Sequence, residues 1–173
     1  MAHIYKIKLH GLLRQFMFCI GVIVFSLIGE FIIINFRGDQ IDFSIVTLMT
    51  VSVVLIFFIP SFLLHFQYFL INRNKELIID EDSSEIMFRN RNTNKLIVFT
   101  EGDIREIIDS KTKEKKNKQS SFFPWYNYSY ATIILKNGIE ICITSLLVNN
   151  IESVFDQKHI TVSTSFYNWI SRR

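Results

Sequence analysis

The sequence predicts a membrane protein of the α+β class. A transmembrane helical hairpin precedes a bent antiparallel β-sheet or small β-barrel, which a C-terminal helix caps. Residues 16–72 carry only four charged side chains and 11 of the 17 phenylalanines, whereas residues 73–173 carry 15 basic and 13 acidic side chains. Such different compositions are typical of segments in different surroundings, the apolar one in lipid and the charged one in water. We therefore divide the 173-residue chain into residues 1–15, 16–72 and 73–173.

The first part of the prediction is the hairpin. Residues 16–36 form an apolar run with one ionisable side chain, long enough to cross a hydrocarbon core of roughly 30 Å. A second apolar run covers residues 43–71. Because only a short polar loop separates the two runs, they must be antiparallel neighbours.

The basic residues indicate the orientation of the hairpin. They precede the first run and follow the second, whereas the loop has one arginine against two aspartates. By the positive-inside rule, both termini are expected in the cytoplasm. The expected location is the cell inner membrane, with residues 1–15 as a cytoplasmic segment and residues 73–173 as a cytoplasmic domain. The side chains concerned are Lys6, Lys8, Arg14, Arg37, Asp39, Asp42, Arg73 and Lys75.

One carboxylate interrupts the apolar runs. Glu30 lies six residues from the loop end of the first run, and antiparallel pairing places it at the depth of Thr50 and Ser52. Ionisable groups at membrane depth are rare and usually face protein or water. We expect Glu30 to form a hydrogen bond with a hydroxyl group of the second helix. The alternative is a functional site that binds a proton or ion, or that drives oligomerisation.

The second part of the prediction is a β domain. Six short segments are rich in β-branched and aromatic residues and are bounded by Asn, Asp, Ser and Gly, as strands are. Asn137-Gly138 indicates a two-residue type I′ turn between the last two. The fourth segment also fits a helix, because three isoleucines share one helical face. The predicted strands are residues 76–80, 85–90, 95–100, 104–110, 128–136 and 139–144.

A helix is expected to close this domain. In residues 145–157 the apolar side chains recur with a helical period. The strands leave no room for crossover helices, so this helix would plug the open end of a bent sheet or barrel. The tail, residues 159–173, is either one more strand or an aromatic and basic segment that returns to the membrane surface.

The order of these elements resembles a known class of proteins. Two membrane helices, the sequence GDIREI at residues 102–107 and the hairpin YSYATIILKNGIEICITSLLV at residues 128–148 are similar to small bacterial membrane proteins with a cytoplasmic pleckstrin-homology-like domain, the YcxB-like proteins. The resemblance implies a seven-stranded bent barrel with a C-terminal helix. The architecture also resembles the two-transmembrane β-barrel effectors of anti-phage signalling, which sense a cyclic nucleotide, although no residue here specifies nucleotide binding.

The loop between the fourth and fifth predicted strands is the first candidate binding surface. Its five lysines are followed at once by aromatic residues. Near an anionic leaflet each lysine contributes roughly 1 kcal/mol, and interfacial aromatic residues add a contact that is insensitive to salt. The alternative is that the aromatic residues pack into the core while the lysines are only solvated. The candidates are Lys111, Lys113, Lys115, Lys116, Lys118, Phe122, Phe123, Trp125 and Tyr126.

The sequence shows no catalytic motif. The patterns GxSxG, HExxH, CxxC and GxGxxG are absent, and the histidines and cysteines lack metal-ligand spacing. We expect no enzyme activity, no cofactor and no metal, and the balanced charge of residues 73–173 implies no nucleic acid partner. The preferred hypothesis is a binding module for membrane lipids, a peptide or a protein partner. The alternative is a membrane-acting effector or toxin-immunity protein of a bacterial defence or competition system, forming a homo-oligomer through its hairpin.

Overall fold

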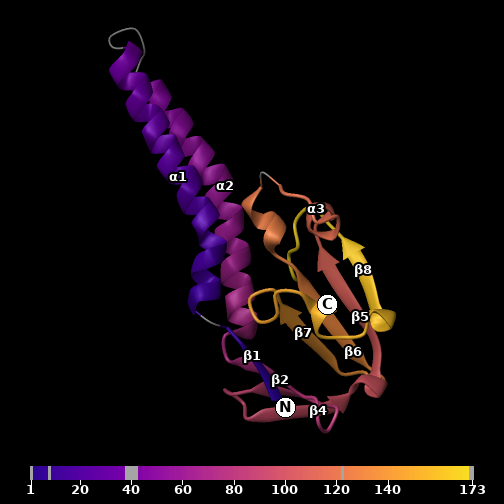
Figure 1. The fold of residues 1–173 in the computed structure, drawn as a ribbon. Helices are drawn as coiled ribbons and strands as arrows, with labels where there is room; N and C mark the ends of the chain where they lie inside the picture. Colours follow the sequence, from indigo (N-terminus) through magenta and orange to yellow (C-terminus); the bar gives the residue numbers. More distant parts are fainter. Residues whose placement is uncertain (1, 8, 38–42, 122, 172–173) are drawn as a thin grey trace.

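The protein consists of a long helical hairpin beside a domain of two β-sheets (Figure 1). The structure is a computed structural model that describes residues 2–7, 9–37, 43–121 and 123–171. The hairpin is formed by α1 (Leu9–Arg37) and α2 (Phe43–Asn72), which pack side by side. The predicted helix at residues 43–71 is therefore confirmed, and α1 begins at Leu9 rather than at residue 16.

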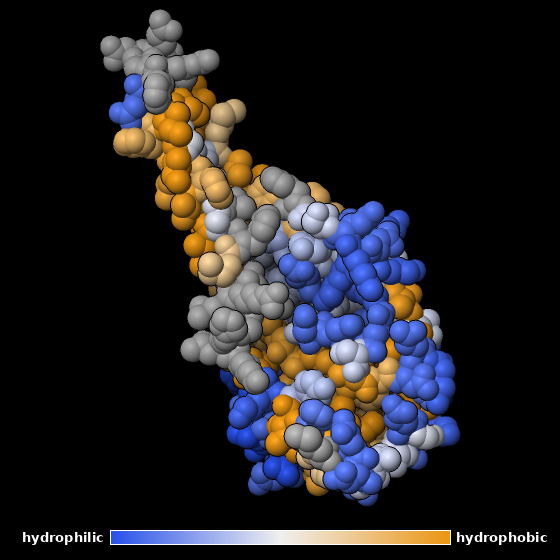
Figure 2. Space-filling model, in the orientation of Figure 1, coloured by the Kyte–Doolittle hydropathy of each residue, from blue (hydrophilic) through white to orange (hydrophobic). Residues whose placement is uncertain are grey.

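The hairpin has an apolar surface where it extends beyond the β domain (Figure 2). Within the described residues, Ser44–Asn72 is the one helix that is long and apolar enough to cross a membrane. Among the described residues of α1, the apolar stretch found is Ile23–Ile33, which is shorter. The helical hairpin is thus observed, whereas its passage through a membrane stays a prediction.

The described residues contain eight strands in two four-stranded sheets, ordered β1-β2-β3-β4 and β7-β6-β5-β8. All neighbours are antiparallel except β5 and β8, which are parallel. All six predicted strands are confirmed, and the fourth is a strand rather than a helix. The strands are β1 (Ala2–Lys6), β2 (Lys75–Asp80), β3 (Glu85–Asn90), β4 (Lys95–Thr100), β5 (Ile104–Lys111), β6 (Tyr130–Leu135), β7 (Glu140–Thr144) and β8 (Ile160–Thr164).

The strand β1 was not predicted from the sequence. It lies before the hairpin and pairs with β2, which follows the hairpin, with Ala2 opposite Asp80 and Lys6 opposite Glu76. Both ends of the hairpin are therefore held by the same sheet. The hairpin is an insertion between two paired strands, not a segment that precedes the β domain.

The hydrophobic core contains side chains from both sheets. In β3, for example, Ile86 and Phe88 are buried while their neighbours Glu85 and Arg89 are exposed, which is the alternation of a strand with one buried face. The core comprises Leu77, Ile86, Phe88, Phe99, Ile104, Ile107, Ala131, Ile133, Leu135, Ile141, Ile143, Leu147, Val148, Ile151 and Phe155.

The predicted helix at residues 145–157 is wrong. The segment consists of turns and short 3-10 segments, η4 (Ile151–Ser153) and η5 (Gln157–His159). Asn150 has an extended backbone, and its side chain accepts a hydrogen bond from the backbone N–H of Glu152. Such local bonds compete with a continuous helix. The apolar spacing reflects burial in the core rather than a helical face.

The hairpin between β6 and β7 is confirmed, but its predicted type I′ turn is wrong. Gly138 has a φ of 84°, whereas the φ of Asn137 is not positive. The N–H of Gly138 donates to the carbonyl of Leu135 (2.9 Å), and the N–H of Ile139 donates to Asn137 Oδ1 (3.0 Å). These contacts are typical of a longer loop that ends in a left-handed glycine.

Candidate functional site

Polar side chains attach the C-terminal half of α2 to the β domain. Gln67 Nε2 donates to the carbonyl of Ile170 (2.8 Å), and the N–H of Ile170 donates to Gln67 Oε1 (3.2 Å). The hydroxyl of Tyr68 donates to the carbonyl of Asn168 (2.8 Å). The tail thus includes one more strand, β8, and then returns to α2.

Aromatic side chains fill the junction between α2 and the β domain. Trp125, in η3 (Pro124–Asn127), is 6% exposed and stacks on Phe123 with ring centroids 4.7 Å apart. Phe57 of α2 stacks on these two rings at 6.5 and 6.1 Å. Such aromatic pairs stabilise a contact beyond the area they bury. We define the junction cluster as Phe57, Leu64, Tyr68, Phe123, Trp125, Tyr128, Tyr130, Leu146, Tyr167 and Ile170.

The aromatic residues predicted as a membrane contact lie in different surroundings. Phe122 is outside the described residues. Phe123 and Tyr126 are half-buried, and Trp125 is buried in the junction cluster. Trp125 is not available at the surface, because α2 of the same chain covers it.

Lys111, one of the predicted surface lysines, is buried. Its Nζ lies 2.9 Å from Asp109 Oδ2 and 2.5 Å from Glu152 Oε1. Burial alone would lower the pKa of Lys111, but the hydrogen bonds and charges of Glu152 and Asp109 outweigh burial and raise its pKa. The two carboxylates more than balance the charge of Lys111, so the group of three carries a net charge of −1.

Lys115 lies in the one-turn helix α3 (Lys113–Lys116) and is partly buried. Its Nζ donates to the carbonyl of Asn127 and to Ser129 Oγ, both at 2.7 Å. Burial lowers the pKa of Lys115 to about 8. Within the described part of the chain, its direct hydrogen-bond partners are neutral oxygens, and the nearby charge of Asp109 only partly offsets the effect of burial on its pKa.

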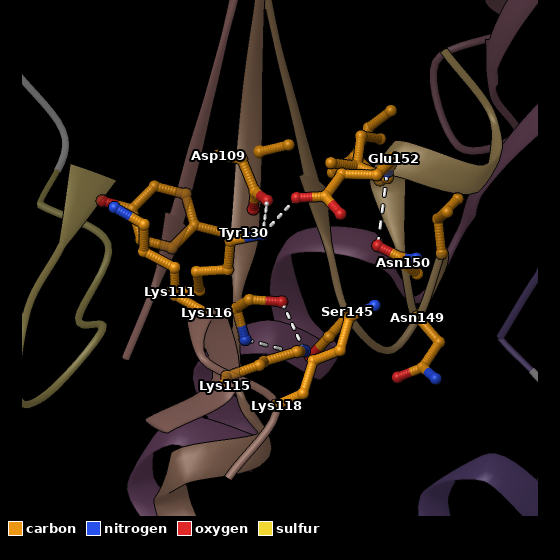
Figure 3. Close-up of a pocket in the computed structure, with 15 residues that line it drawn as sticks. Asp109, Lys111, Lys115, Lys116, Lys118, Tyr130, Ser145, Asn149, Asn150 and Glu152 are labelled. Carbon is orange, nitrogen blue, oxygen red and sulfur yellow. Dashed lines mark hydrogen bonds and ion pairs between the residues drawn. The ribbon is translucent and has the colours of Figure 1, made fainter. Parts of the chain in front are cut away.

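These side chains line a cavity of about 170 Å³ (Figure 3). The amine of Lys111 lies between the carboxylates of Asp109 and Glu152, and Lys115 and Lys118 lie on the opposite side of the cavity. The lining includes four lysines and two carboxylates, so its formal charge is positive. The polar lining residues are Asp109, Lys111, Lys115, Lys116, Lys118, Ser129, Tyr130, Ser145, Asn149, Asn150 and Glu152.

The cavity contains residues that sequence reasoning missed. Asp109 comes from β5, Ser145 follows β7, and Asn149, Asn150 and Glu152 belong to the segment predicted as a helix. The pair Asn149-Asn150 was the one signal for this in the sequence, because asparagine is unfavourable inside a helix and favourable in a turn. Among the predicted lysines, the one at position 113 is exposed and does not line the cavity.

Glu30 has a hydroxyl partner, but its donor is Thr47. Thr47 Oγ1 donates to Glu30 Oε1 (2.7 Å), whereas Ser52 donates to the carbonyl of Leu48 within α2 (2.7 Å). Counting residues from the loop predicts the depth of a side chain but not which side of α2 faces α1. For that reason the predicted partners Thr50 and Ser52 were not the donors. The hydrogen bond gives Glu30 Oε1 a partner inside the hairpin.

No cluster of three His, Cys, Asp or Glu side chains that could hold a metal ion occurs among the residues that the structure describes. The cavity combines an excess of amines with hydroxyl and amide groups. This chemistry suits an anion, because ammonium and amide N–H groups donate hydrogen bonds to anionic oxygens.

The two sheets form one β domain, with a helical hairpin inserted after its first strand. The chain belongs to the PH domain family: a family model described as a PH domain matches residues 4–156. The match spans the hairpin as well as most of both sheets. PH domains are typically non-catalytic binding modules. No curated protein and no solved structure matches the chain.

Proposed function

We propose that the protein is a membrane-anchored binding module whose PH domain binds the anionic headgroup of a phospholipid at the cytoplasmic surface of the inner membrane. The observation that carries the proposal is the lysine-lined cavity beside α3. Figure 1 places α3 at the end of the β domain toward the free end of the hairpin. With the hairpin in a membrane, this end of the domain faces the leaflet.

The charges of the cavity support an anionic ligand. Lys111 with Asp109 and Glu152 carries a net charge of −1, and three further lining lysines at positions 115, 116 and 118 have no ion pair in the described part of the chain, so the formal charge of the lining is +2. Each lysine near an anionic surface contributes about 1 kcal/mol. Because the hairpin already holds the domain at the membrane, even a weak site would be occupied at the high effective concentration of lipid.

The first test compares lipid binding by the full chain and a double variant. Lys116→Gln and Lys118→Asn remove two exposed charges, and asparagine tolerates the left-handed backbone at Lys118 (φ 55°). We expect wild type in detergent to retain phosphatidylglycerol in preference to phosphatidylcholine in native mass spectrometry. The double variant should bind it about 30-fold more weakly, from about 1 kcal/mol per lysine.

The control is Lys95→Gln, which removes an exposed lysine from the start of β4, away from the cavity. It should leave the lipid preference unchanged. Equal retention of the two lipids by wild type would overturn the proposal and leave an acidic peptide or protein as the ligand class. Equal losses in the double variant and the control would show that the cavity is not the site.

Lys115 gives the site a predicted pH dependence. Its pKa of about 8 means that the amine is charged at pH 7 and loses its charge as the pH rises through 8. A bound anion favours the charged form, so affinity for phosphatidylglycerol should be highest below pH 8 and should fall between pH 8 and 10. Lys115→Arg, which stays charged over this range, should give a flat profile. A flat wild-type profile from pH 7 to pH 10 would exclude Lys115 from the binding site.

A further inference from the structure

The free length of the hairpin is short for a lipid bilayer. α2 begins at Phe43, and Phe57 already stacks on Phe123 and Trp125 of the β domain. The residues before Phe57 span about 21 Å at about 1.5 Å per residue. A hydrocarbon core is about 30 Å thick, and the polar loop before α2 is expected outside it. About 9 Å of the core must therefore surround a part of α2 that the β domain already flanks.

The exposed apolar side chains of α2 agree with this comparison of helix length and membrane thickness. Below the level of Phe57, the side chains of α2 that point away from the β domain remain apolar and are 45–50% exposed. They are Ile59, Phe62, Leu63, Phe66 and Leu70. An apolar surface thus continues beside the β domain for more than three further helical turns, which is longer than the roughly 9 Å that the core must still cover.

Two exposed aromatic side chains of the C-terminal tail lie beside the part of α2 that follows Phe57. Phe166 is 63% exposed and packs edge-on against Phe123, with ring centroids 5.4 Å apart. Trp169 is 46% exposed and stacks on Tyr167, whose hydroxyl donates to the carbonyl of Pro60 in α2 (2.8 Å). Both side chains are therefore fixed next to the part of α2 that the length count places in the membrane.

We propose that Phe166 and Trp169 lie in the interfacial region of the cytoplasmic leaflet, in contact with phospholipid. This side of the β domain then lies within the headgroup region of the leaflet rather than in the water below it. Aromatic side chains prefer this region, and Trp in particular has an apolar ring with a polar N–H. The inference rests on the proposed function in one respect, since α2 must cross the membrane.

The test uses tryptophan fluorescence of the full chain in phospholipid bilayers. The sequence has two tryptophans, so Trp125→Phe leaves Trp169 as the only one. We expect its emission to be quenched by lipids brominated near the headgroup end of the acyl chain, and less by lipids brominated near the chain end. Iodide in the aqueous phase should have little effect. Quenching by iodide and not by brominated lipids would overturn the inference.

Two variants keep failure of this inference distinct from failure of the membrane anchor. In a background without tryptophan, Leu96→Trp reports on β4, at the end of the domain away from the free end of the hairpin, and should respond to iodide alone. Val53→Trp reports on an exposed position of α2 and should be quenched by deep brominated lipids. Quenching of the position 53 probe without quenching of Trp169 would refute the contact of Phe166 and Trp169 with phospholipid, and would leave the membrane anchor in place. If brominated lipids quenched neither probe, both the membrane anchor and the contact of Phe166 and Trp169 with phospholipid would be refuted.

Discussion

Replacing Trp125 with alanine is expected to weaken the attachment of the tail and α2 to the β domain by about 3–5 kcal/mol, the usual cost of truncating a buried aromatic side chain. Trp125 is 6% exposed and lies at the centre of the junction cluster. It stacks on Phe123 and Phe57 and makes edge contacts with Phe166 (5.7 Å) and Tyr167 (6.3 Å). Alanine would leave a cavity that these rings cannot close without moving.

The measurement is amide hydrogen exchange of the full chain in detergent, followed in residues 165–171. The backbone N–H of Ile170 in this segment donates to Gln67 of α2, so its exchange reports opening of the junction. A loss of 3 kcal/mol corresponds to about 100-fold faster exchange or more. Leu96→Ala is the matched control, because its side chain is 47% exposed and lies in β4, outside the junction cluster. Similar exchange in both variants would show that hydrogen bonds, not aromatic packing, hold the junction.

The junction also shows where sequence reasoning reached its limit. The aromatic run was identified as unusual from composition alone, but its burial depends on Phe57, which lies more than sixty residues earlier in the chain. No local pattern reveals that partner. The strands, by contrast, were predictable because alternation and turn residues are local properties, as Ile86 and Phe88 in β3 illustrate.

β1 and the cavity were not predictable for a related reason. Residues 2–6 form β1 because they pair with β2, which follows the hairpin in the sequence, and no local pattern in these five residues indicates that partner. The cavity similarly depends on long-range pairing. Lys111 ends β5 and Ser129 precedes β6, and both lie near Glu152 only when these strands pair. Glu152 itself lies in a segment whose apolar spacing resembles that of a helix.

The insertion of the hairpin between β1 and β2 has a mechanical consequence. A helix pair that merely preceded the domain would be joined to it at one point. Here α1 follows β1, α2 leads into β2, and the two strands are paired with each other. Movement of the hairpin in a membrane would therefore be transmitted to the first sheet through two covalent connections, and to the second sheet through the end of α2.

Asn72 makes the connection to the second sheet, and its replacement by leucine is expected to destabilise the domain by about 2–5 kcal/mol. Asn72 is fully buried at the last turn of α2. Its Nδ2 donates to the carbonyl of Cys142 (3.2 Å), and its Oδ1 accepts from the N–H of Thr144 (2.8 Å). β7 is an edge strand, so the amide completes the pairing that a further strand would supply. Leucine would leave the buried N–H of Thr144 unsatisfied and would remove a partner of the partly buried carbonyl of Cys142, at about 1–3 kcal/mol each.

Thr144→Val is the matched control for Asn72→Leu at the same place. Thr144 Oγ1 is buried and has no hydrogen-bond partner among the described residues. Valine retains the shape of the side chain and the backbone N–H that Asn72 binds, so stability should be unchanged or should rise by about 1 kcal/mol. Urea denaturation of the full chain in detergent, with exchange of the Thr144 amide as a local readout, compares the two variants. If both destabilised the domain equally, tight packing around Thr144 would account for the effect of Asn72→Leu, and the hydrogen bonds from Asn72 to β7 would contribute little.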